Sequence, residues 1–216
     1  MNQDSSSKHS SGDGPIVFVI DDEESVRVAL SSLFRSIDIR VETFATPVEF
    51  LESSPPDVPS CLVLDVRLKG LSGLDFQQKL VESNTRIPVI FMTGHGDIAM
   101  AIQAMKAGAV DFLVKPFRDQ DLLDAVSAAH QIDTRRREID KQNAEMHACF
   151  LTLTAREREV MIHAAKGLMN KQIAGEMGLS EVTVKIHRGH AMKKMRAKSF
   201  ADLVRMAESL GLGQKR

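Results

Sequence analysis

The stretch VFVIDDEES, residues 17–25, decides how the rest of the chain is interpreted. Its run of β-branched and apolar residues predicts a strand that is buried on both faces, as in a parallel sheet. The run ends in four carboxylates, of which Asp21 and Asp22 come first. Two adjacent anions repel each other and are costly to desolvate unless a positive charge lies between them. Because ligands of open α/β sheets bind outside the carboxyl ends of the strands, we expect a cation here.

Strand-like and helix-like segments alternate along the chain from Pro15 to about Leu123. The predicted strands are PIVFVI (15–20), RVETF (40–44), CLVLD (61–65), IPVIFMTG (87–94) and AVDFLVKPF (109–117). Helical spacing of apolar residues follows each strand. Five such βα units predict an α/β fold, a five-stranded parallel, doubly wound sheet of flavodoxin-like type with right-handed crossovers.

The second part of the chain is predicted to be helical throughout. Residues 119–146 contain neither Gly nor Pro, and their later part is highly charged, which is typical of a solvated helix. Further helices are predicted at 156–167, 170–178, 181–197 and 200–211. Thr154 with Glu157 forms a capping-box sequence before the first of them. The two helices joined by a Gly-Leu-Ser turn predict a helix-turn-helix, which suits a DNA major groove.

Composition and charge divide the chain into modules. We predict a flexible tail at 1–14, an α/β domain at 15–130, a helical linker at 131–147 and a small all-α domain at 148–216. Residues 1–130 hold 11 Lys and Arg against 19 Asp and Glu, a net charge of −8. The linker holds four of each, and the last domain holds 13 against 6, a net charge of +7. An acidic first module and a basic second one indicate that the second faces a polyanion.

Other features indicate a cytoplasmic protein that does not enter a membrane. At 43% hydrophobic and 26% charged residues, the composition is ordinary for a globular protein. No apolar run approaches the roughly 18–20 residues that span a bilayer. The polar, Ser-rich start lacks the apolar segment of a signal peptide. With only Cys61 and Cys149 present, disulfides are not expected, which fits a reducing compartment.

Polar residues stand at the carboxyl ends of four predicted strands: Asp21 and Asp22, Asp65, Thr93, and Lys115. In a parallel sheet these ends lie along one edge, so the side chains can converge. Carboxylates and a backbone carbonyl suit Mg²⁺, which prefers hard oxygen ligands. The Thr93 hydroxyl and the Lys115 ammonium remain to bind phosphoryl oxygens. The set predicts a site where Asp65 attacks a phosphoryl donor and becomes an aspartyl phosphate.

Residues 15–130 resemble the receiver domain of bacterial two-component response regulators, through VIDDEE, LVLDVRLKGLSG, VIFMTGHGD and AMKAGAVDFLVKPF. The last domain resembles the LuxR-type helix-turn-helix, through LTAREREV, NKQIAGEMGLSEVTVKIHR and KSFADLV. Together they resemble the FixJ/NarL type, most of all its FixJ-like branch. The resemblance covers about 200 residues, and its motifs are spread over several elements.

The resemblance implies a role for individual residues. Asp65 would be the phosphoacceptor, and Asp21, Asp22, Asp65 and the backbone carbonyl of Arg67 would hold Mg²⁺, for which Mn²⁺ can substitute. Thr93 and Phe112 would be the switch residues, Lys115 the phosphate ligand, and the Lys115–Pro116 bond cis. His95 is interpreted as a loop residue that tunes dephosphorylation. One departure is Lys69, where the family usually has Pro.

In LuxR-type domains the helix after Ser180 lies in the major groove. Helical spacing turns Val184, Ala191 and Met195 inward. The residues expected to contact DNA are Thr183, Lys185, Ile186, Arg188 and His190. A solvated basic face is the alternative for the cations. Gly189 departs from the family and costs about 1 kcal/mol of helix propensity relative to Ala. Either Gly189 allows a close approach to the backbone, or one contact with a DNA base is missing at this position.

These features predict a phosphorylation-dependent DNA-binding transcription regulator that is not an enzyme beyond its own phosphorylation chemistry. The implied partners are a sensor histidine kinase, a double-stranded operator, a second copy when phosphorylated, and RNA polymerase. Opposite charges on the modules would permit autoinhibition, whereas a stiff helix at 119–146 would keep the modules apart, and we favour the helix. The rival functions are a haloacid-dehalogenase-type phosphatase, which carries its aspartates as Asp-x-Asp on one strand, and an unphosphorylated DNA-binding scaffold.

Overall fold

The computed structural model describes residues 14–70, 72–94 and 98–212. The predicted tail, apart from Gly14, and His95 lie outside the described residues. The described residues form two compact units, which divide between Arg137 and Glu138. Each unit is described by itself below.

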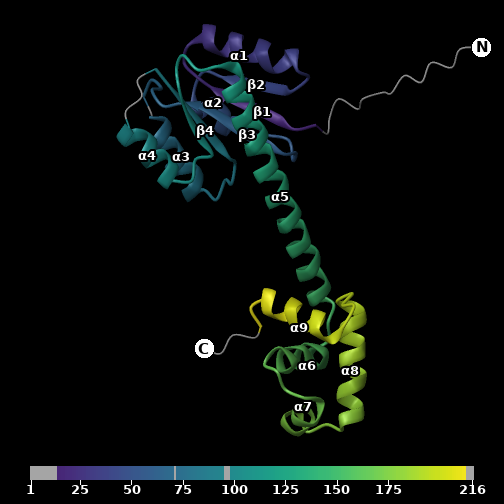
Figure 1. Cartoon of the computed structure of the whole chain (residues 1–216). Coiled ribbons are helices and arrows are strands. Elements are labelled where there is room, and N and C mark those ends of the chain that lie inside the picture. The colour runs from purple at the N-terminus through teal and green to yellow at the C-terminus, as the bar shows by residue number, and fades with distance from the viewer. Residues whose placement is uncertain (1–13, 71, 95–97, 213–216) are drawn as a thin grey trace, which may run out of the picture. The chain divides into compact units, whose positions relative to one another are not determined.

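A parallel sheet with the strand order β2-β1-β3-β4-β5 forms the centre of the first unit (Figure 1). Its strands are β1 (Ile16–Ile20), β2 (Arg40–Phe44), β3 (Ser60–Asp65), β4 (Val89–Thr93) and β5 (Asp111–Val114). The helices between them are α1 (Glu24–Ser36), α2 (Pro47–Glu52), α3 (Gly73–Glu82) and α4 (Ile98–Lys106). Every pairing is parallel, so the predicted doubly wound fold is confirmed.

The central strands are buried on both faces, as the apolar runs predict. Alternate residues of β1 point to opposite sides, since successive side chains of a strand alternate. Phe18 packs with Phe76 of α3 and Phe50 of α2 in one core cluster. Val17 and Val19 pack with residues of α1 and α5 (Asp119–Leu151) in the other. The sheet is thus covered on both faces, which leaves its strand ends as the place where polar side chains can gather.

Cys61 of β3 lies in the second of these core clusters and is completely buried. Burial raises the pKa of its thiol well above the usual range, and the charge of Asp133 raises it further. The thiol sulfur lies 3.5 Å from Nε2 of His130.

Helix α5 runs without interruption from Asp119 to Leu151 and includes all the residues assigned above to the linker. The carboxylate of Asp133 is fully buried and accepts a hydrogen bond from the backbone N–H of Ser60 at 3.0 Å. It also pairs with Arg136 at 2.6 Å and Arg137 at 2.7 Å. The structure therefore places Asp133 in the first unit, although its charged neighbourhood in the sequence is typical of a solvated segment.

The second unit contains α6 (Ala155–Ala165), α7 (Asn170–Met177), α8 (Glu181–Lys194) and α9 (Phe200–Ser209). The capping box of Thr154 and Glu157 is present at the start of α6, as predicted. Gly178 ends α7 in the left-handed region, with φ of 64°, and Ser180 caps α8. The chain thus turns sharply between α7 and α8, which confirms the predicted helix-turn-helix. In the described part of the chain, no helix is both long enough and apolar enough to cross a membrane.

Candidate functional site

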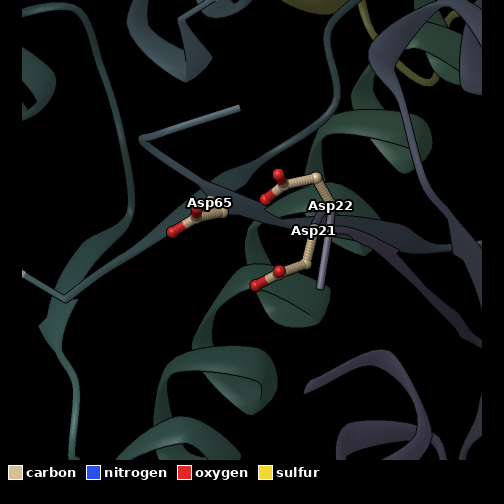
Figure 2. A group of neighbouring side chains, drawn as sticks. All are labelled: Asp21, Asp22 and Asp65. Atoms are coloured by element: carbon tan, nitrogen blue, oxygen red, sulfur yellow. The ribbon is translucent and has the colours of Figure 1, made fainter. Parts of the chain in front are cut away.

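Three carboxylates converge at the carboxyl ends of neighbouring strands (Figure 2). Asp21 and Asp22 follow β1, and Asp65 is the last residue of β3. One carboxylate oxygen from each of the three lies within 4.8 Å of the others. Asp21 is fully buried, Asp65 is 7% exposed, and Asp22 is half-buried. The sequence predicted this convergence because the carboxyl ends of parallel strands lie along one edge of a sheet, and the structure adds that β1 and β3 are neighbours.

Lys115, just after β5, brings a positive charge to this acidic cluster. Its Nζ lies 2.7 Å from Oδ2 of Asp21 and 3.5 Å from Oδ1 of Asp65. Burial raises the pKa of Asp65, and the charge of Asp21 adds to this effect while Lys115 opposes it. Burial disfavours the charged ammonium of Lys115, but its hydrogen bond to Asp21 and the charges of both carboxylates outweigh burial and raise its pKa. Lys115 therefore stays protonated beside Asp65.

The backbone around the acidic cluster is held in place by local contacts. The N–H of Glu23 donates to Oδ1 of Asp21 at 2.9 Å, and Arg27 donates to the Asp21 carbonyl at 2.7 Å. Beyond Asp65 the chain turns back closely, since the N–H of Gly73 donates to the Val66 carbonyl at 2.9 Å. A Cβ at Gly73 would lie only 2.4 Å from the carbonyl oxygen of Asp65. Only glycine fits at that position without displacing the backbone at the end of β3.

The remaining predicted site residues lie around the same edge of the sheet. Thr93 ends β4, next to β3, and is fully buried. Phe112 of β5 is half-buried, with its ring centroid 6.4 Å from that of Phe91. Arg67 is an exposed residue in the loop after β3. The Lys115–Pro116 bond is cis, as the resemblance implies.

The donor set fits a hard divalent cation. Three carboxylates supply only oxygen atoms, which Mg²⁺ prefers, and their mutual repulsion is relieved by positive charge. Lys115, which follows β5, neutralises part of this negative charge through its contacts with Asp21 and Asp65. A feature that the sequence did not predict is the ion pair of Lys69 with Asp22, at 3.1 Å. This contact depends on the path of the loop after β3, which no local pattern encodes.

In the second unit, α8 presents the two faces that its spacing predicts. Val184 and Ala191 are fully buried, and Met195, just after the helix, is 2% exposed. Lys185, Ile186 and His190 are exposed. Thr183, at the helix start, is half-buried, and its hydroxyl lies 2.8 Å from that of Ser180.

Arg188, which is among the residues expected from the sequence to contact DNA, has partners within the domain. Arg188 is half-buried, and it donates to Oδ1 of Asn170 in α7 at 3.0 Å. Its guanidinium also lies over the ring of Phe200 in α9, 4.9 Å from the centroid. Helical spacing alone missed these partners because they come from other helices. At Gly189 a Cβ would meet no atom of the chain within 4 Å, so packing within the domain does not require glycine there.

Comparison with protein families agrees with this arrangement. Residues 17–127 match the response regulator receiver domain, and residues 151–207 match the luxR family of bacterial regulatory proteins. The acidic cluster lies within the first match, and α8 lies within the second.

Known proteins resemble the chain over most of its length. Nodulation protein W of Bradyrhizobium diazoefficiens is 59% identical over 197 residues, which cover 91% of this chain and 87% of that protein. Transcriptional regulatory protein FixJ of Rhizobium meliloti is 39% identical, covering 91% and 97%. The structure of response regulator StyR superposes with a TM-score of 0.79 at 47% identity, covering 90% and 98%. The chain therefore belongs to the response regulators of the FixJ/NarL type, which join a receiver domain to a LuxR-type DNA-binding domain and regulate transcription in response to phosphorylation.

Proposed function

We propose that Asp65 accepts a phosphoryl group from a partner histidine kinase, with Mg²⁺ held by Asp21, Asp22, Asp65 and the backbone carbonyl of Arg67. The observation that carries this proposal is the convergence of three carboxylates beside Lys115. When bound, the metal supplies positive charge that neutralises oxygens of the transferred group. Mn²⁺, with the same preference for oxygen ligands, is expected to substitute.

The protein's own residues position the transferred group. The side chain of Asp65 is 9% exposed, so little of it is reached by solvent. Lys115 stays charged and is held between Asp21 and Asp65, where its ammonium can move to phosphoryl oxygens. Thr93, one strand away, offers a hydroxyl to the same group. Movement of Thr93 toward the phosphoryl group would leave space for Phe112 to turn inward and would reshape the surface of α4 and β5.

That surface is the proposed site of dimerisation after phosphorylation. Large apolar side chains are exposed there: Ile98 is 78% exposed, and Ile102, Met105 and Val114 are each about half exposed. Adjacent exposed apolar residues on one face favour an interface with another protein. A symmetric dimer would present two copies of α8 to an operator with two-fold symmetry.

We propose that Lys185, Ile186 and His190 face the operator, with Thr183 near a phosphate. Arg188 would contribute through the position of α8, or contact DNA after leaving Asn170. RNA polymerase is a further proposed partner. We propose the cytoplasm as the location, since the protein needs both a kinase and DNA. Neither family match supports the phosphatase alternative, and Asp21 follows β1 whereas Asp65 ends β3, unlike an Asp-x-Asp pair on one strand.

The test is Asp65→Asn with acetyl phosphate or a kinase in Mg²⁺. We expect incorporation of phosphate to be lost because the amide is not a nucleophile, while the far-ultraviolet circular dichroism is unchanged. Asp57→Asn is the matched control, since the Asp57 side chain is 99% exposed and pairs with Arg137 away from the cluster. Undiminished labelling of Asp65→Asn at another residue would contradict the assignment.

A further inference from the structure

Lys69 brings a second ammonium to the acidic cluster, from the loop that follows β3. Its Nζ lies 3.1 Å from Oδ2 of Asp22, while its side chain remains 87% exposed. The resemblance to receiver domains leads one to expect Pro at this position, so the charge is a feature of this chain. Lys69 therefore adds an interaction that the family's usual residue cannot make.

The two lysines divide the three carboxylates between them. Lys115 contacts Asp21 and Asp65, and Lys69 contacts Asp22. Lys115 is held firmly, since its side chain is 23% exposed and it lies between two carboxylates. Lys69 contacts only Asp22 among the described ion pairs of this cluster and lies at the surface, so it is the ammonium that can leave with little cost.

A divalent cation and Lys69 both need the carboxylate of Asp22. Asp22 is one of three residues whose carboxylate oxygens lie within 4.8 Å of each other, so a metal bound there takes an Asp22 oxygen. The ammonium of Lys69 also lowers the negative potential that attracts the metal. We propose that Lys69 competes with Mg²⁺ for Asp22 and so raises the Mg²⁺ concentration at which the site fills.

This inference rests on the proposed metal site, and its expected size follows from the exposure of the ion pair. Exposed pairs contribute little because water and salt screen them. Removing the competing charge should therefore strengthen Mg²⁺ binding about two- to fivefold at low ionic strength. The difference should shrink as salt rises, since the Debye length falls from about 30 Å at 0.01 M to about 3 Å at 1 M.

The experiment is calorimetric titration of metal-free, unphosphorylated full-length protein with MgCl₂. Lys69→Gln removes the charge, and Lys69→Arg keeps it. Lys79→Gln is the matched control, because Lys79 is exposed on α3 and forms no contact with the cluster among those described. We expect a lower dissociation constant only for Lys69→Gln, with an unchanged midpoint of thermal unfolding in chelator.

The outcomes separate the two proposals. If the natural sequence binds no Mg²⁺, the metal site itself is refuted. If it binds Mg²⁺ but Lys69→Gln binds with the same or a higher dissociation constant, competition by Lys69 is refuted and the metal site stands. An equal strengthening by Lys79→Gln would show a general charge effect and would also refute competition at Asp22.

Discussion

Gly73 is the residue at which the site has the least room. A Cβ there would come within 2.4 Å of the Asp65 carbonyl oxygen and 3.1 Å of the Val66 Cα, both backbone atoms. Gly73→Ala should therefore destabilise the receiver by about 1–3 kcal/mol, since overpacking forces backbone shifts. Urea unfolding followed by circular dichroism measures this change.

Gly189→Ala is the control for Gly73→Ala, because a Cβ at residue 189 has open space and Ala is the better helix former. We expect it to be neutral or stabilising. A Gly73→Ala protein as stable as the natural sequence would show that the loop after β3 relaxes without cost.

Lys185 and Arg188 should behave differently although both are cations of α8. Lys185 is exposed, so Lys185→Ala should weaken DNA binding and leave the stability of the protein unchanged. If Lys185 contacts a phosphate, the substitution should also reduce the slope of log affinity against log salt by about one. Arg188→Ala should also destabilise the second unit by about 1–2 kcal/mol, since it loses the contacts with Asn170 and Phe200.

Both variants are measured on sites selected from random DNA by the phosphorylated protein, with thermal unfolding beside the binding curves. Unchanged affinity for Lys185→Ala would favour a solvated basic face. Unchanged stability for Arg188→Ala would mean that its two contacts contribute nothing measurable.

Among the elements, α5 is tied to the sheet by Asp133. This buried carboxylate accepts from Ser60 at the start of β3 and pairs with Arg136 and Arg137. Asp133→Ala leaves two guanidinium groups and a backbone N–H without this partner, and we expect a loss of about 3–5 kcal/mol in receiver stability. Urea unfolding of the full-length protein measures it.

Asp124→Ala is the control for Asp133→Ala, because Asp124 is an exposed residue of the same helix and bonds only to Gln120 among the hydrogen bonds described. Its effect should stay within about 0.5 kcal/mol. Equal stability of the two variants would show that α5 is held by its apolar face alone.

At the scale of the whole molecule, the opposite net charges of the two modules matter for the regulation of DNA binding. The isolated second unit, residues 138–216, keeps Met146, Cys149 and Phe150, which pack against its core. We expect this fragment to bind DNA more weakly than the phosphorylated full-length protein, because a monomer occupies one half-site. Affinities measured at the same salt concentration provide the test. A fragment that binds much more tightly than the unphosphorylated full-length protein would favour autoinhibition by the acidic module.

The sequence predicted the features that follow from buried parallel strands and from helical spacing. Asp21, Asp65 and Lys115 follow or end buried apolar runs, and parallel strands bring such ends together. The contacts of Lys69, Asp133 and Arg188 were not predictable in this way. Each of these residues has a partner in another part of the fold, and charged residues in polar segments give no local sign that they will find one.

Cys61 and Cys149, the only cysteines of the chain, lie in different units. Cys61 is completely buried in β3, and Cys149 is half-buried near the end of α5. Because alkylating reagents attack an accessible thiolate, modification of Cys61 must wait for the sheet to open. The rate at which Cys61 is alkylated therefore reports how often the first unit opens, so the natural sequence carries a chemical reporter of local opening in its sheet.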